Sequence, residues 1–229
     1  MHKGGWSIII DELWDSINVN IKLRVAIFNS SNNQSINLNQ LGHTVERQLK
    51  NSYEMSYISK RFQVAIQKSG LDNMPNRKFL RLVGKKITVK VSVQYRIITS
   101  ELSRYPNELL IQIRSNEGKW RGLYGNAALG GSYLNLNESI VSGIIRGLDD
   151  NTIPHELGHS LGLLHVDEPD TYHEDARQYY PVKRQRTKDS LNAMFSGGSP
   201  YMHNLTSTVI TPRQMDIVIE NYRFGNLNR

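Results

Sequence analysis

The sequence predicts a single α+β domain, and three observations indicate this fold class. The chain has 229 residues, which is enough for one well-packed core. Some segments alternate apolar and polar residues, as strands do, while others repeat apolar residues every three or four positions, as helices do. The expected order is a strand, a helix and four more strands, with further helices after them, and this order favours an α+β arrangement.

The first predicted elements are a strand and a helix. Residues 22–29, KLRVAIFN, alternate in polarity and predict a half-buried strand. Residues 30–35, SSNNQS, predict a loop. Apolar side chains then recur on one face of an expected amphipathic helix, namely Leu38, Leu41, Val45, Leu49 and Tyr53.

Four strands are predicted in the middle of the chain. Residues 87–98, ITVKVSVQYRII, alternate over almost their whole length, and residues 107–114 give the next strand. Residues 121–137 predict two short strands around the turn Gly130-Gly131. Small residues in the first of these two suit an edge strand that another backbone approaches closely.

The last predicted element is a helix over residues 211–222. Thr211 is the expected N-cap, and Pro212 suits the first helical position. Residues 1–21 and 59–84 give no prediction.

Three of the seven histidines of the chain lie between residues 155 and 165. His155 and His159 are four residues apart, so on a helix both imidazoles lie on one face and can reach one ion. Gly162 can adopt the left-handed conformation that ends a helix and turns the chain sharply. His165 can then return to the same ion from outside the helix. The residues that can cap the start of this helix are Asp150, Asn151 and Thr152.

These residue types predict the chemistry of a zinc hydrolase. Three neutral imidazoles around zinc leave the fourth position for water, as in a catalytic site, and zinc lowers the pKa of that water to about 7. Glu156 is next to the first expected ligand, where it can take a proton from the water and pass it to a leaving amine. The reaction expected of this set is hydrolysis of a peptide bond. The alternative for His155 and His159 is a hydrogen-bonded pair in the core.

The segment HELGHSLGLLH, residues 155–165, resembles the extended zinc motif of the metzincin metallopeptidases, His-Glu-x-x-His-x-x-Gly-x-x-His, at every fixed position. Residues 190–198, SLNAMFSGG, resemble the methionine-containing turn of that family, with Met194 as its methionine. The resemblance implies zinc ligation by His155, His159 and His165, with Glu156 as general base. It also implies that Met194 supports the site without touching the metal, whereas the alternative for Met194 is an ordinary core methionine. No metzincin subfamily is assigned.

The resemblance also implies the arrangement of the fold. A metzincin-like zincin catalytic domain has a mixed twisted sheet with an edge strand over the cleft, a backing helix, an active-site helix and a C-terminal helix. We expect one catalytic domain over residues 1–229, with an upper lobe over 1–162 and a smaller lower lobe over 163–229. The lower lobe would hold the third ligand, the methionine turn and the last helix. An extended substrate is expected to pair with the edge strand, which comprises Leu123, Tyr124, Gly125, Asn126, Ala127, Ala128 and Leu129.

Composition excludes some chemistry and leaves other questions open. The chain has no cysteine, which excludes disulfides, thiolate metal ligands and a cysteine nucleophile. No apolar run is long enough for a membrane-spanning helix or for the core of a signal peptide, so a targeting segment is expected to be absent or removed. The net charge of +7 is expected to mark a mildly basic surface.

The function predicted from the sequence is that of a zinc-dependent endopeptidase, with one catalytic Zn²⁺ and a protein or peptide substrate. We expect a monomer that is secreted or delivered outside the producing cell, such as a secreted protease or toxin, with neither nucleic acid nor membrane as partner. One alternative is another zinc hydrolase, such as an aminopeptidase, with a distant glutamate such as Glu174 as third ligand. The other is a non-enzymatic basic binding module in which the histidines are structural.

Two charged segments follow the histidines. Residues 166–175, VDEPDTYHED, have enough carboxylates to consider a Ca²⁺ site, but we expect a solvent-exposed loop because the spacing matches no known binding loop. Residues 183–188, KRQRTK, predict an exposed basic loop beside the cleft.

Overall fold

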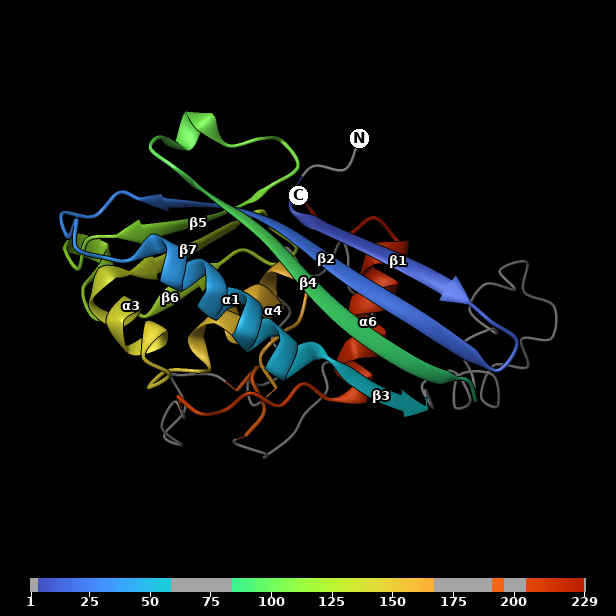
Figure 1. Ribbon diagram of the computed structural model, residues 1–229. Helices are drawn as coiled ribbons and strands as arrows, with labels where there is room; N and C mark the ends of the chain where they lie inside the picture. Colours follow the sequence, from blue (N-terminus) through green and yellow to red (C-terminus); the bar gives the residue numbers. More distant parts are fainter. Residues whose placement is uncertain (1–3, 59–83, 167–190, 196–204, 229) are drawn as a thin grey trace.

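A seven-stranded mixed sheet forms the framework of the protein (Figure 1). The computed structural model describes residues 4–58, 84–166, 191–195 and 205–228. Both parallel and antiparallel pairs occur in the sheet, and helices pack against it, which confirms the predicted α+β class. In chain order the described strands and α-helices are β1 (Trp6–Glu12), β2 (Ser16–Asn29), α1 (Leu38–Tyr53), β3 (Met55–Ile58), β4 (Lys86–Ile98), β5 (Leu109–Arg114), β6 (Gly125–Ala127), β7 (Tyr133–Asn137), α3 (Glu138–Ile145), α4 (Thr152–Ser160) and α6 (Pro212–Arg223).

The long strand β2 organises the sheet, whose order is β3-β4-β2-β5-β7-β6. Strand β4 runs parallel to β2 along its length. On the other side of β2, β1 pairs antiparallel with residues 17–23 and β5 pairs parallel with residues 25–29. Strand β7 is parallel to β5, and the short strand β6 is antiparallel to β7. Strand β6 is therefore an edge of the sheet.

The predicted strand over residues 22–29 is confirmed but begins earlier, at Ser16. The odd-numbered residues from Ile17 to Ile27 are buried on one face of β2, because side chains alternate across a strand. The predicted strands over residues 87–98 and 107–114 correspond to β4 and β5, with bounds that differ by one or two residues.

Helix α1 covers the buried face of the sheet, as its predicted apolar face requires. The side chain of Asn37 caps the helix by accepting a hydrogen bond from the N–H of Gln40 (3.0 Å). The residues Leu41, Val45, Leu49 and Tyr53 are buried in one large apolar cluster together with side chains of β2, β4, α4 and α6. The C-terminal end of α1 thus lies against α4, the helix that contains His155 and His159. There the Tyr53 hydroxyl donates to the carbonyl of Pro154 (2.8 Å).

Among the strands and α-helices of the described residues, β1, β3 and α3 have no counterpart in the sequence predictions. In β1 three consecutive isoleucines conceal the alternation, although Ile8 is buried and Ile9 is 42% exposed. Helix α3 begins where β7 ends, with Asn137 as its N-cap. Its eight residues give too short a pattern to stand out beside the preceding strand.

The two short strands predicted over residues 121–137 are β6 and β7. Strand β6 is shorter than the predicted edge strand, because it comprises only Gly125, Asn126 and Ala127. Leu123 and Tyr124 precede it in the loop, and Ala128 and Leu129 follow it.

The C-terminal helix α6 begins as predicted, with Thr211 as N-cap and Pro212 in the first turn. Gln214 completes a reciprocal capping box with Thr211. In the described part of the chain, no helix has the length and apolar character needed to cross a bilayer.

Candidate metal centre

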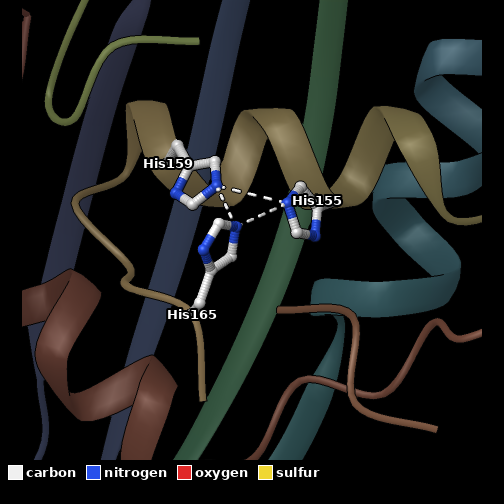
Figure 2. A group of neighbouring side chains, drawn as sticks. All are labelled: His155, His159 and His165. Atoms are coloured by element: carbon white, nitrogen blue, oxygen red, sulfur yellow. Dashed lines mark hydrogen bonds between the residues drawn. The ribbon is translucent and has the colours of Figure 1, made fainter. Parts of the chain in front are cut away.

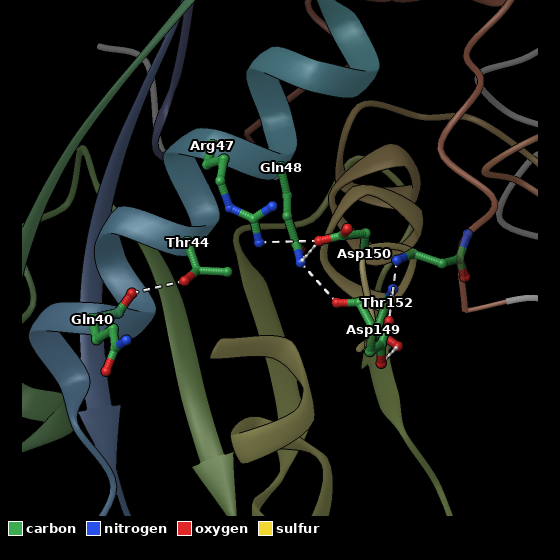
Figure 3. Close-up of polar contacts among 8 residues, drawn as sticks. Gln40, Thr44, Arg47, Gln48, Asp149, Asp150 and Thr152 are labelled. Atoms are coloured by element: carbon green, nitrogen blue, oxygen red, sulfur yellow. Dashed lines mark hydrogen bonds and ion pairs between the residues drawn. The ribbon is translucent and has the colours of Figure 1, made fainter. Parts of the chain in front are cut away.

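The histidine helix α4 is fixed at its start by a carboxylate. The side chain of Asp149 accepts hydrogen bonds from the backbone N–H groups of Asn151 and Thr152 and from the Thr152 hydroxyl. It therefore supplies the capping hydrogen bonds, whereas Asn151, one of the three candidates from the sequence, occupies the N-cap position without a capping hydrogen bond from its side chain. Figure 3 shows how α1 holds the same loop: Gln48 donates to the Asp149 carbonyl, and Arg47 pairs with Asp150.

Helix α4 ends in a glycine turn directly after its second histidine. Gly162 has a φ of 79°, in the left-handed region that favours glycine. The N–H of Leu163 donates to the carbonyl of Gly158 (2.9 Å), and that of Gly162 donates to the carbonyl of His159 (2.8 Å). This pair of bonds is a Schellman motif. Asn221 of α6 donates to the carbonyl of Leu161 (3.1 Å), so that the C-terminal helix also holds the turn.

The segment around Met194 lies against the histidine helix. The backbone N–H of Val166 donates to the carbonyl of Met194 (3.0 Å), which connects this segment to the chain just after His165. The Met194 side chain is fully buried, and its sulfur lies so close to Gly158 that a Cβ there would overlap it. The glycine inside the HELGH segment therefore makes room for the methionine.

The three histidines converge on one point (Figure 2). The Nε2 atoms of His155 and His159 are 3.2 Å apart, and that of His165 lies 3.1 Å from the first and 3.0 Å from the second. The His155 side chain is buried, and the other two are half-buried. Within the described residues, these three histidines form the group of side chains that could hold a metal ion.

The outer nitrogens of two rings fix which ring atoms face one another. Nδ1 of His155 lies 2.7 Å from the carbonyl oxygen of Ala193, and Nδ1 of His159 lies 2.9 Å from that of Leu163. Each Nδ1 must carry the hydrogen, because a carbonyl oxygen only accepts. A neutral imidazole has one N–H, so both Nε2 atoms present lone pairs. The contact between them in Figure 2 is therefore not a hydrogen bond of two neutral rings.

This arrangement fits a cation, because lone pairs that face each other repel unless positive charge lies between them. Tetrahedral ligands at ~2.0–2.1 Å from zinc are roughly 3.3 Å apart, close to the observed spacing of the three Nε2 atoms. Bonds from Nδ1 to backbone carbonyls are also the usual support of histidines that bind metals. His155, His159 and His165 are thus the residues that could hold zinc.

Glu156 lies between the helix and the edge strand. Its side chain is buried, with 7% exposed, and burial raises the pKa of its carboxyl to about 8. A hydrogen bond from the backbone N–H of Ala127 in β6 opposes this rise in pKa. A Cβ at Gly125 would lie only 2.9 Å from the Cγ and Oε1 atoms of Glu156. The glycine in β6 therefore permits the close approach of the carboxyl.

The raised pKa of Glu156 predicts a pH-dependent stability of the metal-free protein. Below about pH 4.5 the carboxyl is protonated in both the folded and unfolded states, and its contribution to stability is fully present. As the pH rises to about 8 the unfolded state releases the proton first, so this contribution is lost at up to about 1.4 kcal/mol per pH unit. Denaturant unfolding of the wild type and Glu156→Gln should therefore show the wild type losing stability relative to the variant over this range. Parallel pH profiles would contradict the burial of an ionisable carboxyl.

A second prediction concerns the contact between Gly125 and Glu156. In Gly125→Ala the added Cβ should displace the carboxyl and lower any hydrolytic rate by up to about 100-fold, because small misplacements of reacting groups are costly. Zinc affinity should not change, since no ligand moves. Gly143→Ala in α3 is the matched control, because a Cβ there meets nothing within 4 Å. Equal rates for both variants would show that the contact does not matter.

Part of the predicted site lies outside the described residues. This holds for the acidic residues 167–175, the alternative ligand Glu174 and the basic segment 183–188. Among the described residues, the sequence pattern did not indicate Asp149 or Asn221, which hold the two ends of α4, and it indicated Asn151 only as a candidate cap, not as a bridge to distant segments. Buried asparagines that bridge distant segments leave no periodic signal.

Comparisons with known proteins add a structural likeness. No family model and no curated protein sequence matches the chain. The structure is similar to the crystal structure of archaemetzincin from Methanopyrus kandleri, with 12% identity and a TM-score of 0.41 over 87% of this chain and 95% of that chain.

Proposed function

We propose that the protein is a zinc-dependent metallopeptidase that hydrolyses internal peptide bonds of extended polypeptides. One observation carries this proposal: the Nε2 atoms of three histidines lie 3.0–3.2 Å from one another. Two of these histidines are on helix α4, and the third follows the turn at its end. The metzincin-like motif of residues 155–165 and the carboxyl of Glu156 beside the helix support the same function.

In this proposal the histidines bind and the glutamate moves protons. His155, His159 and His165 hold zinc through Nε2, and their orientation is set by the carbonyls that accept from Nδ1. When bound there, zinc supplies a Lewis acid that polarises the substrate carbonyl and lowers the pKa of water. The Glu156 carboxylate accepts a proton from the attacking water and later gives it to the leaving amine.

The edge strand β6 is proposed to bind the substrate. The carbonyl of Tyr124 accepts from the N–H of Asn137 (3.0 Å), so by alternation the even-numbered residues of β6 bond to β7. Gly125 and Ala127 then direct their main-chain groups away from β7, and the Ala127 N–H donates to the Glu156 carboxyl. A peptide in extended conformation can pair with this side of the strand, which places its backbone beside the catalytic carboxyl.

Two further parts of the proposal follow from the sequence. Residues 163–229 would form the lower part of the catalytic domain, below the cleft, and residues 1–162 the upper part. Export from the producing cell stays a prediction.

The experiment that tests the function is digestion of a denatured protein by the purified chain. With one equivalent of zinc, mass spectrometry should find fragments from internal cleavage, and a chelator should abolish them. Stepwise loss of N-terminal residues would instead support the aminopeptidase alternative. A chain that binds one zinc ion and cleaves neither kind of substrate would contradict the proposal.

A further inference from the structure

We propose that Asn151 is a positioning residue for the metal ligand His155, and that it acts through the carbonyl group of Ala193. The inference rests on the proposed metal site and extends it to a residue outside the motif. The Asn151 Nδ2 donates to the carbonyls of Ala193 (3.2 Å) and Ser207 (2.5 Å). The same Ala193 oxygen accepts from Nδ1 of His155 (2.7 Å). One carbonyl thus joins the asparagine to the histidine.

The surroundings fix the direction of the Asn151 amide. Both neighbouring groups are carbonyl oxygens, so only the NH₂ side of the amide can face them. Its Oδ1 atom is buried and has no hydrogen-bond partner among the described residues. A buried polar atom without a partner lowers stability, so packing alone would favour an apolar residue at this position. The donors of the amide are therefore the reason for an asparagine here.

The position of Asn151 in the chain explains how it can act on the metal ligand. Its backbone N–H donates to the side chain of Asp149 (3.1 Å) at the start of α4, one helical turn before His155. Its side chain reaches the segment of Ala193, which is far away in sequence. Asn151 thereby holds the Ala193 carbonyl at the place where it receives Nδ1–H of His155. This bond directs the Nε2 lone pair of His155 toward the other two histidines.

Gln48 provides a control with a comparable structural role. It is also buried, and its amide nitrogen also donates two hydrogen bonds, to the carbonyl of Asp149 (2.7 Å) and to Oδ1 of Asp150 (2.9 Å). It stabilises the loop before α4 without touching the Ala193 carbonyl. Gln48→Ala should therefore weaken the fold about as much as Asn151→Ala, but leave the orientation of His155 unchanged.

The test measures metal affinity rather than catalysis. Zn²⁺ affinities of the wild type, Asn151→Ala and Gln48→Ala are determined by competition with a chromophoric chelator, after circular dichroism shows that each variant is folded. Asn151→Ala should lose about 10- to 100-fold in affinity, as for other outer partners of ligand histidines, and Gln48→Ala should lose none. The absorption spectrum of bound Co²⁺ should change only in Asn151→Ala. Unchanged affinity in Asn151→Ala, or an equal loss in both variants, would overturn the inference.

A measurement on the wild type keeps the inference testable if Asn151→Ala does not fold. Nitrogen-15 NMR of the metal-free wild type should show His155 as the Nδ1–H tautomer, and the Nε2–H tautomer would overturn the inference. The outcomes separate this inference from the proposed function, because metal affinity does not depend on the reaction. A wild type that binds zinc but cleaves no peptide refutes the peptidase alone, whereas a wild type that binds no zinc refutes both.

Discussion

Replacing His165 with alanine is expected to lower the zinc affinity of the chain more than any change outside the ligands. The His165 Nε2 lies within 3.1 Å of the other two, so its loss leaves two imidazoles for the ion. Loss of an outer partner already costs roughly 10- to 100-fold in affinity, and loss of a ligand should exceed this. Hydrolysis should fall to background at zinc concentrations that saturate the wild type. Equilibrium dialysis and a cleavage assay measure both effects.

His43→Ala is the matched control for this change. His43 lies on α1, with its ring edge-on to Tyr95 and away from the three convergent histidines. Its removal should leave zinc affinity unchanged. If His165→Ala also kept the affinity of the wild type, a different third ligand would have to be sought, as in the alternative of a distant glutamate.

The second large effect is expected for Glu156→Gln. Glutamine has nearly the shape of glutamate but accepts no proton, so the rate of hydrolysis should fall by about 10²- to 10⁴-fold. Zinc affinity should stay close to that of the wild type, because Glu156 is not among the three convergent ligands. The measurement is kcat for a fluorogenic peptide, at equal zinc occupancy of wild type and variant.

Glu46→Gln controls for the loss of a carboxylate as such. Glu46 forms a partly exposed ion pair with Lys50 on α1, and its replacement should leave kcat unchanged. A Glu156→Gln variant that binds zinc and cleaves at the wild-type rate would remove the glutamate from the mechanism.

Much of the fold could be predicted because its main elements have clean periodicity. Strand β4 alternates along nearly its whole length, and α1 places Leu41, Val45 and Leu49 on one buried face. Strand β1 could not be predicted, since its isoleucines occupy both faces. The pairing of β1 and β5 with different halves of β2 is likewise absent from any local pattern, because it depends on contacts between distant segments.

In the candidate site, too, the residues of the local motif could be predicted and their long-range contacts could not. The spacing of His155, His159, Gly162 and His165 predicts a helix, a turn and a return of the chain, and the three Nε2 atoms do meet. The supports of these residues come from elsewhere in the sequence. The Ala193 carbonyl lies 38 residues from His155, and Asn221 lies 60 residues from Leu161. Such contacts exist only once the chain has folded.

The hydrogen bond between Ala127 and Glu156 was also beyond prediction. The sequence indicated the small residues of the edge strand and, separately, the glutamate of the helix. It did not indicate that Gly125 and Ala127 would lie against the carboxyl, whose pKa is raised by burial and lowered in part by the Ala127 hydrogen bond. The structure thereby links the proposed substrate strand to the proposed general base.

In the proposed site, the turn at Gly162 brings a third imidazole to the two on helix α4 around one zinc ion. X-ray absorption at the zinc edge of the protein loaded with one equivalent of metal tests this arrangement. Three imidazole nitrogens at ~2.0–2.1 Å, with one oxygen ligand from solvent, are expected. The same spectrum with two imidazoles, or with no change between wild type and His165→Ala, would contradict it.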